Sequence, residues 1–186
     1  MLKIIEGKHK RRKILTPNNH KTRPTSSRMR KSIFDILSHS KYFTDKIFNT
    51  KVLDVFAGSG IMGIECLSRG TTYCKFIDNS NESINTINKN LGSLNIKLHS
   101  SVIKLDATHP PTTTEKYGLS FFDPPYSTLN FSIIIARWEE KGWFAKNAIC
   151  IYEKRKDTLF SLPKNFIIIK KITKGTSEVL ILKKFQ

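Results

Sequence analysis

Short apolar runs alternate with longer segments through the middle of the chain, and this alternation constrains the fold more than any other feature of the sequence. Most of the intervening segments are long enough for a helix, and the apolar runs are Val52–Ala57, Tyr73–Asp78, Leu98–Ile103, Gly118–Asp123 and Ala148–Glu153. Strands that are apolar along their whole length are typical of a parallel sheet covered on both faces. The sequence therefore predicts an α/β fold.

The C-terminal part of the chain departs from this alternation. Phe166–Ile172 and Glu178–Lys184 are rich in β-branched residues, and Gly175 lies between them. Two such runs joined by a short glycine-containing turn are typical of an antiparallel hairpin. We therefore expect a mostly parallel sheet that ends in an antiparallel pair of strands.

The N-terminal residues form a region with its own pattern. Leu2–Ile5 and Lys13–Thr16 predict two short strands of a hairpin that is appended to the domain and lies outside its core. Apolar residues recur at helical spacing over Ser26–Ser38, which predicts an amphipathic helix that packs on the domain while its cations face outward. We expect this extension over residues 1–40 and one compact domain over residues 41–186.

Positive charge is concentrated in this N-terminal extension. The chain has 32 Lys and Arg against 15 Asp and Glu, a net charge of +17, and its first 31 residues contain eleven of these cations and one acid, Glu6. A basic arm of this kind is typical of proteins that bind the phosphate backbone of nucleic acids. A solvated, lysine-rich surface is the alternative interpretation. The cations predicted to contact nucleic acid are Lys10, Arg11, Arg12, Arg23, Arg28 and Arg30.

The cysteines and the apolar stretches indicate in which cellular compartment the protein is expected. Cys66, Cys74 and Cys150 are odd in number and widely spaced, so we expect buried thiols and neither a disulfide framework nor a metal site. The start of the chain has no signal-peptide pattern, and no apolar stretch approaches the roughly 20 residues of a membrane span. A cytoplasmic protein is therefore expected.

Three glycines follow the first of the predicted parallel strands and open a helical segment. Gly58, Gly60 and Gly63 let the backbone approach a ligand closely, and a helix N-terminus offers free N–H groups to it. At the end of the next predicted strand, Asp78 is placed to accept hydrogen bonds from a ribose diol. The pattern favours a nucleoside-containing cofactor over a simple tight turn, and it leaves NAD and S-adenosylmethionine (AdoMet) both open.

A second motif, Asp123-Pro124-Pro125-Tyr126, follows another predicted strand at the edge where open α/β sheets bind ligands. Two prolines stiffen the loop and expose carbonyl acceptors, Asp123 adds a carboxylate, and Tyr126 adds a flat ring. Acceptors beside a stacking face are typical of a pocket for a base that carries an NH₂ group. A proline-rich surface turn is the alternative.

These residues indicate methylation at nitrogen. Hydrogen bonds from an exocyclic amine to Asp123 and to the Pro124 carbonyl would localise its lone pair, so that the amine could attack a sulfonium methyl in line. The sequence contains no Pro-Cys dipeptide to act as the nucleophile of a base C5 methyltransferase. Asp106, near the end of the third predicted strand, is a further candidate for holding the adenine amine of a cofactor.

The chain resembles the RsmD family, bacterial guanine-N2 methyltransferases of small-subunit (16S) ribosomal RNA. The resemblance covers nearly the whole length. It lies in the segments Ile4–Lys8, Arg23-Pro24-Thr25 with Arg28 and Arg30, Phe34–Leu37, Leu53–Gly60, Leu67–Gly70, Asp106-Ala107 and Asp123–Tyr126.

The resemblance implies a Rossmann-like class I methyltransferase fold with a seven-stranded sheet, and AdoMet as cofactor. The residues expected to bind AdoMet are Asp54, Ala57, Gly58, Gly60, Asp78, Asn79, Asp106 and Ala107. The residues expected to hold the target guanine are Asp123, Pro124, Pro125 and Tyr126. The resemblance also implies that the Arg-rich extension engages ribosomal RNA in the small subunit or an assembly intermediate. We expect a monomer.

Three other functions remain open at the level of sequence. An N6-adenine methyltransferase of RNA or DNA could use the same Asp-Pro-Pro-Tyr loop. A catalytically silent RNA-binding assembly factor would not need the intact glycines and Asp-Pro-Pro-Tyr motif seen here. An NAD-dependent dehydrogenase would need a catalytic group near the nicotinamide, and nothing beyond the glycine loop indicates one.

Overall fold

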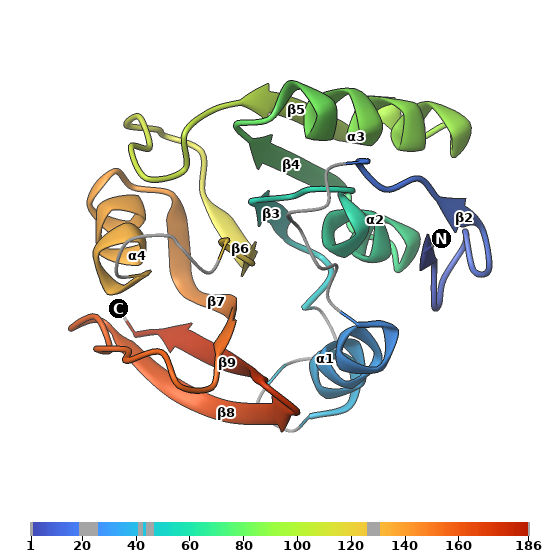
Figure 1. Ribbon diagram of the computed structural model, residues 1–186. Coiled ribbons are helices and arrows are strands. Elements are labelled where there is room, and N and C mark those ends of the chain that lie inside the picture. Colours follow the sequence, from blue (N-terminus) through green and yellow to red (C-terminus); the bar gives the residue numbers. More distant parts are fainter. Residues whose placement is uncertain (1, 19–25, 41–42, 44–46, 126–130, 186) are drawn as a thin grey trace.

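The protein is built around one seven-stranded sheet. The computed structural model describes residues 2–18, 26–40, 43, 47–125 and 131–185. The strands of this sheet are β3 (Lys51–Val55), β4 (Tyr73–Asp78), β5 (Ser100–Lys104), β6 (Tyr117–Phe122), β7 (Phe144–Arg155), β8 (Phe166–Lys174) and β9 (Ser177–Lys184). They lie in the order β5-β4-β3-β6-β7-β9-β8 (Figure 1).

The direction of the strands confirms the predicted class I methyltransferase fold. Strands β3 to β7 pair in parallel, whereas β9 is antiparallel to both β7 and β8. The last strand of the chain is thus inserted next to β7, and the expected C-terminal hairpin closes one end of the sheet. The order reverses between β3 and β6, and ligands bind at such a switch point in open α/β sheets.

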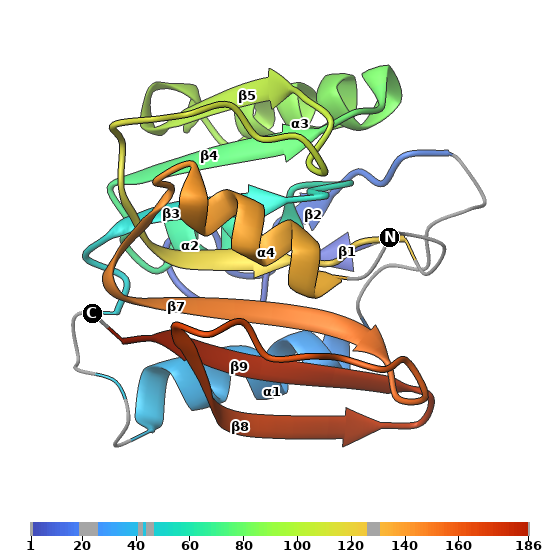
Figure 2. The ribbon, with the colours of Figure 1, turned by 90° about the vertical axis from the view of Figure 1, so that its left-hand side faces the viewer.

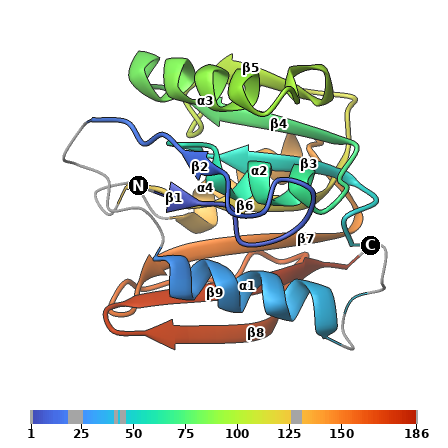
Figure 3. The same ribbon diagram turned by 90° about the vertical axis from the view of Figure 1, so that its right-hand side faces the viewer.

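Helices cover both faces of the sheet. On one face lie α1 (Ser27–His39), α2 (Ile61–Ser68) and α3 (Asn81–Ser93), and a short 3-10 helix, η1 (Lys97–His99), follows α3 (Figure 3). On the other face lies α4 (Phe131–Glu140) (Figure 2). The side chain of Ser26 accepts a hydrogen bond from Met29 N at 3.1 Å, so α1 begins where a serine can cap it.

The crossover from β5 to β6 contains no helix, although all of residues 105–116 are described. Side chains of α4 and the turn after it hold this segment against the sheet. The indole N–H of Trp138 donates to the Ala107 carbonyl at 2.8 Å, and that of Trp143 donates to the Pro111 carbonyl at 2.8 Å. Two buried tryptophans thus give this segment a defined course where a helix would be more usual.

The N-terminal hairpin is present, but the expectation that it lies outside the core is wrong. Strands β1 (Leu2–Lys3) and β2 (Lys13–Ile14) pair antiparallel, and Ile4 and Ile14 are buried in the same apolar cluster as α1, α2 and α3. Gly7, with φ of +84°, lies so close to the carbonyl of Ser68 that a Cβ would stand 1.9 Å from its oxygen. The hairpin therefore packs as an integral layer on α2. The predicted division at residue 40 stays a prediction.

Cys66, Cys74 and Cys150 are buried free thiols, as expected. None of the helices in the described part of the chain has the length and hydropathy of a membrane span.

Candidate cofactor and base-binding site

The carboxyl ends of four parallel strands meet at one edge of the sheet, which faces the viewer in Figure 1. Val55 of β3 is in register with Ile77 of β4 and with Phe122 of β6. The predicted motifs follow directly after these positions. This edge, which we call the cofactor edge, therefore brings together the glycine loop, Asp78, Asp106 and the Asp-Pro-Pro loop, as the sequence predicted.

The glycine loop connects β3 to α2 in a conformation that favours glycine. Gly58 and Gly60 have φ of +54° and +75°, and Gly60 is the N-cap residue of α2. The N–H of Ala57 donates to the Ile77 carbonyl at 3.1 Å, which fixes the start of the loop on β4. Apart from its chain neighbours, no residue in the described ranges has an atom within 4 Å of a Cβ built at Gly58, so open space lies beside the backbone here.

Asp78 ends β4 and fastens the loop to it. Its carboxylate accepts from the N–H of Gly58 at 2.8 Å and from the N–H of Ser80 at 2.9 Å. Each carboxylate oxygen can accept more than one hydrogen bond, so these contacts orient Asp78 and leave acceptor capacity for ribose hydroxyls. Asn79, the residue after it, is exposed.

Asp54 is buried near the end of β3, just before the glycine loop. Its carboxylate accepts from the N–H of Gly63 at 2.9 Å. Burial raises the pKa of Asp54 to about 7, the Gly63 hydrogen bond opposes this rise, and the charge of Asp78 adds to it. Asp54 thus ties β3 to the first turn of α2 and places a titratable carboxyl beneath the glycine loop.

Asp106 follows β5 at the same edge, and its side chain is exposed. The N–H of Leu105 donates to the Asp78 carbonyl at 3.0 Å, which joins the ends of β5 and β4. Hydrogen bonds from His109 and Thr108 lower the pKa of Asp106. This carboxylate is therefore an anionic acceptor near the cofactor edge, with Ala107 buried beside it.

The Asp-Pro-Pro loop leaves β6 next to the glycine loop. Asp123 is half-buried, Pro124 is buried and Pro125 is exposed, while Tyr126 lies outside the described residues. On the neighbouring strand β7, burial and the charge of Asp123 raise the pKa of Tyr152 to about 12. The ring of Phe131 stacks on Tyr152 with centroids 3.5 Å apart. A carboxylate beside buried aromatic rings is a setting in which hydrogen bonds to an amine are strong.

One of the predicted RNA contacts is wrong. Arg30 is 1% exposed, and its Nε lies 3.2 Å from a carboxylate oxygen of the fully buried Glu65. The guanidinium also donates to the Lys3 carbonyl at 2.8 Å. Arg30 therefore fastens α1 and the hairpin to α2, because a buried cation requires a charged partner.

The other predicted cations lie at two places. Lys10, Arg11 and Arg12 are exposed on the hairpin, whose tip packs at the C-terminal end of α2. Arg28 is exposed in the first turn of α1, and Arg23 lies outside the described residues. Because α2 begins at the cofactor edge and ends at the opposite edge, the hairpin tip is about 12 Å away along the helix axis. These cations stay predicted RNA contacts.

Sequence reasoning missed Asn90, which contacts the glycine loop. Its side-chain amide is 1% exposed and donates to the Ser59 carbonyl at 2.9 Å. An Asn in the middle of a helix is a weak signal, since it is more often exposed. Only its position on the buried face of α3, together with Ile87 and Leu91, could have drawn attention to it.

The arrangement fits AdoMet. The oriented carboxylate of Asp78 suits a ribose diol, the open space at Gly58 admits a ligand against the backbone, and the start of α2 suits a carboxylate. Asp106, whose pKa is lowered, adds negative charge that suits a cationic ligand. No group of three or more His, Cys, Asp or Glu in the described ranges could hold a metal ion.

Comparisons with known proteins agree with this geometry. The family model described as Conserved hypothetical protein 95 matches residues 2–183. The Buchnera aphidicola (subsp. Acyrthosiphon pisum) protein named Ribosomal RNA small subunit methyltransferase D is 35% identical, over 90% of this chain and 85% of that protein. The chain belongs to the RsmD methyltransferase family.

Solved structures show the same fold for this RsmD-family chain. The structure of yhhF from Escherichia coli has a TM-score of 0.85 at 24% identity and covers 100% of this chain and 98% of that one. A more distant structure, SMU.776 complexed with SAH, has a TM-score of 0.55 at 12% identity and covers 75% of this chain and 47% of that one. The class I methyltransferase fold is thus confirmed by independent structures.

Proposed function

We propose that this protein transfers a methyl group from AdoMet to the exocyclic N2 amine of a guanine in small-subunit ribosomal RNA. The observation that carries the proposal is the position of Asp123 and Pro124 directly after β6, whose end is in register with the end of β3 where the glycine loop begins. A base acceptor and a cofactor loop on adjacent strands can bring an amine and a methyl donor together. The name of the Buchnera relative supports ribosomal RNA as the substrate.

The residues at this edge divide the chemistry between them. AdoMet supplies a methyl group on a positively charged sulfur. Gly58, Asp78 and Asp106 would hold the cofactor, with Ala57, Asn79 and Ala107 beside them. Asp123 and the Pro124 carbonyl would accept hydrogen bonds from the amine, and Tyr126 would stack on the base. When the N–C bond formed and the S–C bond broke, S-adenosylhomocysteine would leave and the nitrogen would become more acidic. Asp123 would stabilise the positive charge that develops on the amine, and the amine would give up its extra proton through Asp123 to solvent.

The outcome of the reaction depends on positioning, because none of the three cysteines is placed as a covalent nucleophile. The described cysteines are buried, and burial raises the pKa of the Cys66, Cys74 and Cys150 thiols. None of them is therefore an accessible thiolate. Direct transfer to nitrogen is the chemistry that the Asp-Pro-Pro loop supports.

The decisive experiment is transfer of a labelled methyl group from AdoMet to small ribosomal subunits that lack the modification. The product nucleoside is identified after complete digestion of the RNA. N2-methylguanosine is the expected product. N6-methyladenosine would keep the methyltransferase and change the base, and RNA binding without transfer would support an assembly factor in its place.

The same preparations test which form of the RNA is the substrate. We expect a monomer that works in the cytoplasm on the small subunit or an assembly intermediate. Transfer to naked 16S RNA and to assembled subunits is compared at equal RNA concentration. A clear preference for particles would identify a ribonucleoprotein as the substrate, and equal transfer would identify RNA alone.

A further inference from the structure

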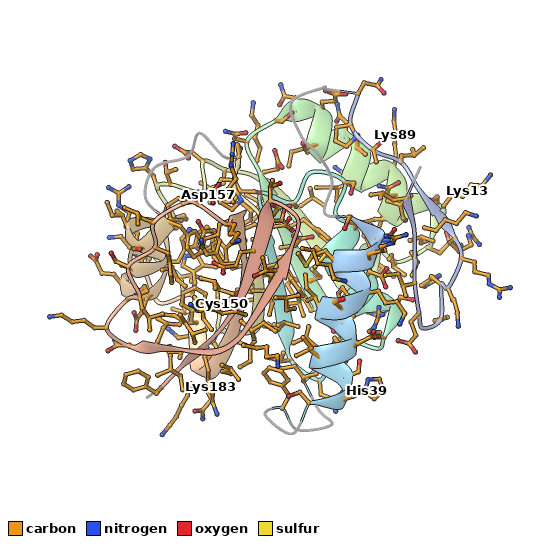
Figure 4. The ribbon with its side chains drawn as sticks, turned by 60° about the horizontal axis from the view of Figure 1, so that its bottom comes forward. Lys13, His39, Lys89, Cys150, Asp157 and Lys183 are labelled. Carbon is orange, nitrogen blue, oxygen red and sulfur yellow. The ribbon has the colours of Figure 1, made fainter. Side chains whose placement is uncertain are left out.

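The N-terminal arm, residues 12–18, lies along α3 from its last turn to its first. The guanidinium of Arg12 donates to the Ser93 carbonyl at 2.9 Å, Leu15 pairs with Asn90, and Asn18 N donates to the carboxylate of Glu82. Because α3 begins just after Asp78, the arm runs toward the cofactor edge (Figure 3). In Figure 4, Lys13 and Lys89 lie on the same side of the molecule, where the arm meets α3.

Asn90 joins this arm to the glycine loop with one side chain. Its Oδ1 accepts from the N–H of Leu15 at 2.9 Å, and its Nδ2 donates to the Leu15 carbonyl at 3.0 Å. The same Nδ2 donates to the Ser59 carbonyl at 2.9 Å. Ser59 stands between Gly58 and Gly60, so the amide reaches the centre of the loop.

The chemistry of these contacts requires an amide. An aspartate could accept from Leu15 N but would face the carbonyls of Leu15 and Ser59 without a proton to donate. An alanine would leave the buried Ser59 carbonyl and the partly buried N–H and carbonyl of Leu15 without this partner. The loop itself consists of small residues, two of them glycines with positive φ, so it has little side-chain packing of its own to hold it.

We infer that Asn90 is a positioning residue that makes the N-terminal arm part of the AdoMet site. It does not need to touch the cofactor. It holds the Ser59 carbonyl, and through it the glycine loop, in the conformation that receives the ligand. The arm completes this arrangement because Leu15 occupies the remaining donor and acceptor of the amide. The inference rests on the proposed function only in taking AdoMet as the ligand.

The test measures binding of S-adenosylhomocysteine by calorimetry to the full-length protein without RNA. Asn90→Ala is expected to weaken binding by about tenfold, the effect of losing about 1.4 kcal/mol of hydrogen bonding. The matched control is Asn88→Ala on the exposed face of α3, whose amide donates to the Ile84 carbonyl of its own helix. Asn88→Ala should bind like the unaltered protein.

A second pair of variants tests the arm and remains informative if Asn90→Ala fails to fold. Leu15→Pro removes the backbone N–H that donates a hydrogen bond to Asn90 Oδ1. Leu15→Ala keeps this N–H and only shortens a side chain that is 50% exposed. Leu15→Pro is expected to bind S-adenosylhomocysteine several-fold more weakly than Leu15→Ala. In methyl transfer, Asn90→Ala and Leu15→Pro should raise KM for AdoMet much more than they lower kcat.

The outcomes separate this inference from the proposed function. Unchanged affinity in Leu15→Pro relative to Leu15→Ala would overturn the inference, as would unchanged affinity in a folded Asn90→Ala protein. Failure of the unaltered protein to bind S-adenosylhomocysteine would contradict AdoMet dependence itself. A product other than N2-methylguanosine would change the proposed target and leave the inference intact.

Discussion

Arg30 and Glu65 form a buried ion pair, with Nε of Arg30 3.2 Å from Oε1 of Glu65. The same carboxylate accepts from the N–H of Ile5 at 2.8 Å and pairs with Arg69. Three elements that are distant in sequence, the hairpin, α1 and α2, thus meet at one charged group. An arginine that the sequence placed among the RNA contacts is part of the interior.

Arg30→Ala should destabilise the protein by about 3–5 kcal/mol, because it leaves Glu65 buried without that cation. Lys31→Ala is the control, since the Lys31 side chain is 65% exposed and pairs with Asp35 on the surface. Its effect should stay within about 0.5 kcal/mol. Urea unfolding measures both. If the two variants were equally stable and only Arg30→Ala lost RNA affinity, Arg30 would be an RNA contact after all.

Asp54 should make the protein less stable as the pH rises. Its pKa is about 7 in the folded protein, against 3.8 for an ordinary Asp, so between these values the folded state binds the extra proton. Stability is therefore greatest below about pH 4 for this group and falls as pH rises toward 7. The difference is on the order of 4 kcal/mol at 1.36 kcal/mol per pKa unit.

The Asp54→Asn variant isolates this effect, because its side-chain carbonyl can still accept from Gly63 N. Denaturant unfolding at several pH values between 4 and 8 should show a smaller loss of stability with pH in the variant. His9 acts in the opposite direction, since burial and the charges of Lys8 and Arg12 lower its pKa. It is present in both proteins, so the difference between their profiles reports Asp54. Parallel profiles would show that Asp54 titrates normally.

Asp123→Ala should reduce methyl transfer by about a hundredfold or more while S-adenosylhomocysteine affinity stays within about tenfold. Removing one hydrogen bond that forms to the reacting group in the transition state has an effect of this size. Single-turnover transfer and calorimetry give the two quantities. Asp157→Ala, an exposed acid in the loop after β7, is the control and should retain transfer. Near-normal turnover of Asp123→Ala would remove it from the mechanism.

Replacing Arg11 and Arg12 with alanine should weaken RNA binding broadly and flatten its salt dependence. The slope of log K against log salt should fall by roughly 0.7 for each phosphate of single-stranded RNA that the variant no longer neutralises. Lys146→Ala, an exposed cation at the amino end of β7, is the reference. A slope that is the same in all three proteins would show that the hairpin tip does not bind phosphate.

Much of the fold and of the site follows from local sequence. The apolar runs predicted five parallel strands, and the glycine-containing turn near Gly175 predicted the final hairpin; the structure has both. Gly58, Asp78, Asp106 and Asp123 could be brought together from sequence alone, because each lies at or just after the end of a strand and the carboxyl ends of parallel strands share one edge.

Tertiary structure decided the features that depend on contacts between distant residues rather than on the spacing of apolar residues along the chain. Helical spacing could place Arg30 near the edge of an apolar stripe, but only the position of Glu65 on α2 makes its burial favourable. Burial of Ile4 and Ile14 likewise depends on the surface that α2 and α3 offer. Asn90 has a function only because the arm and the glycine loop both lie within reach of its amide. Local patterns encode which face of an element is apolar, and long-range packing alone determines what that face meets.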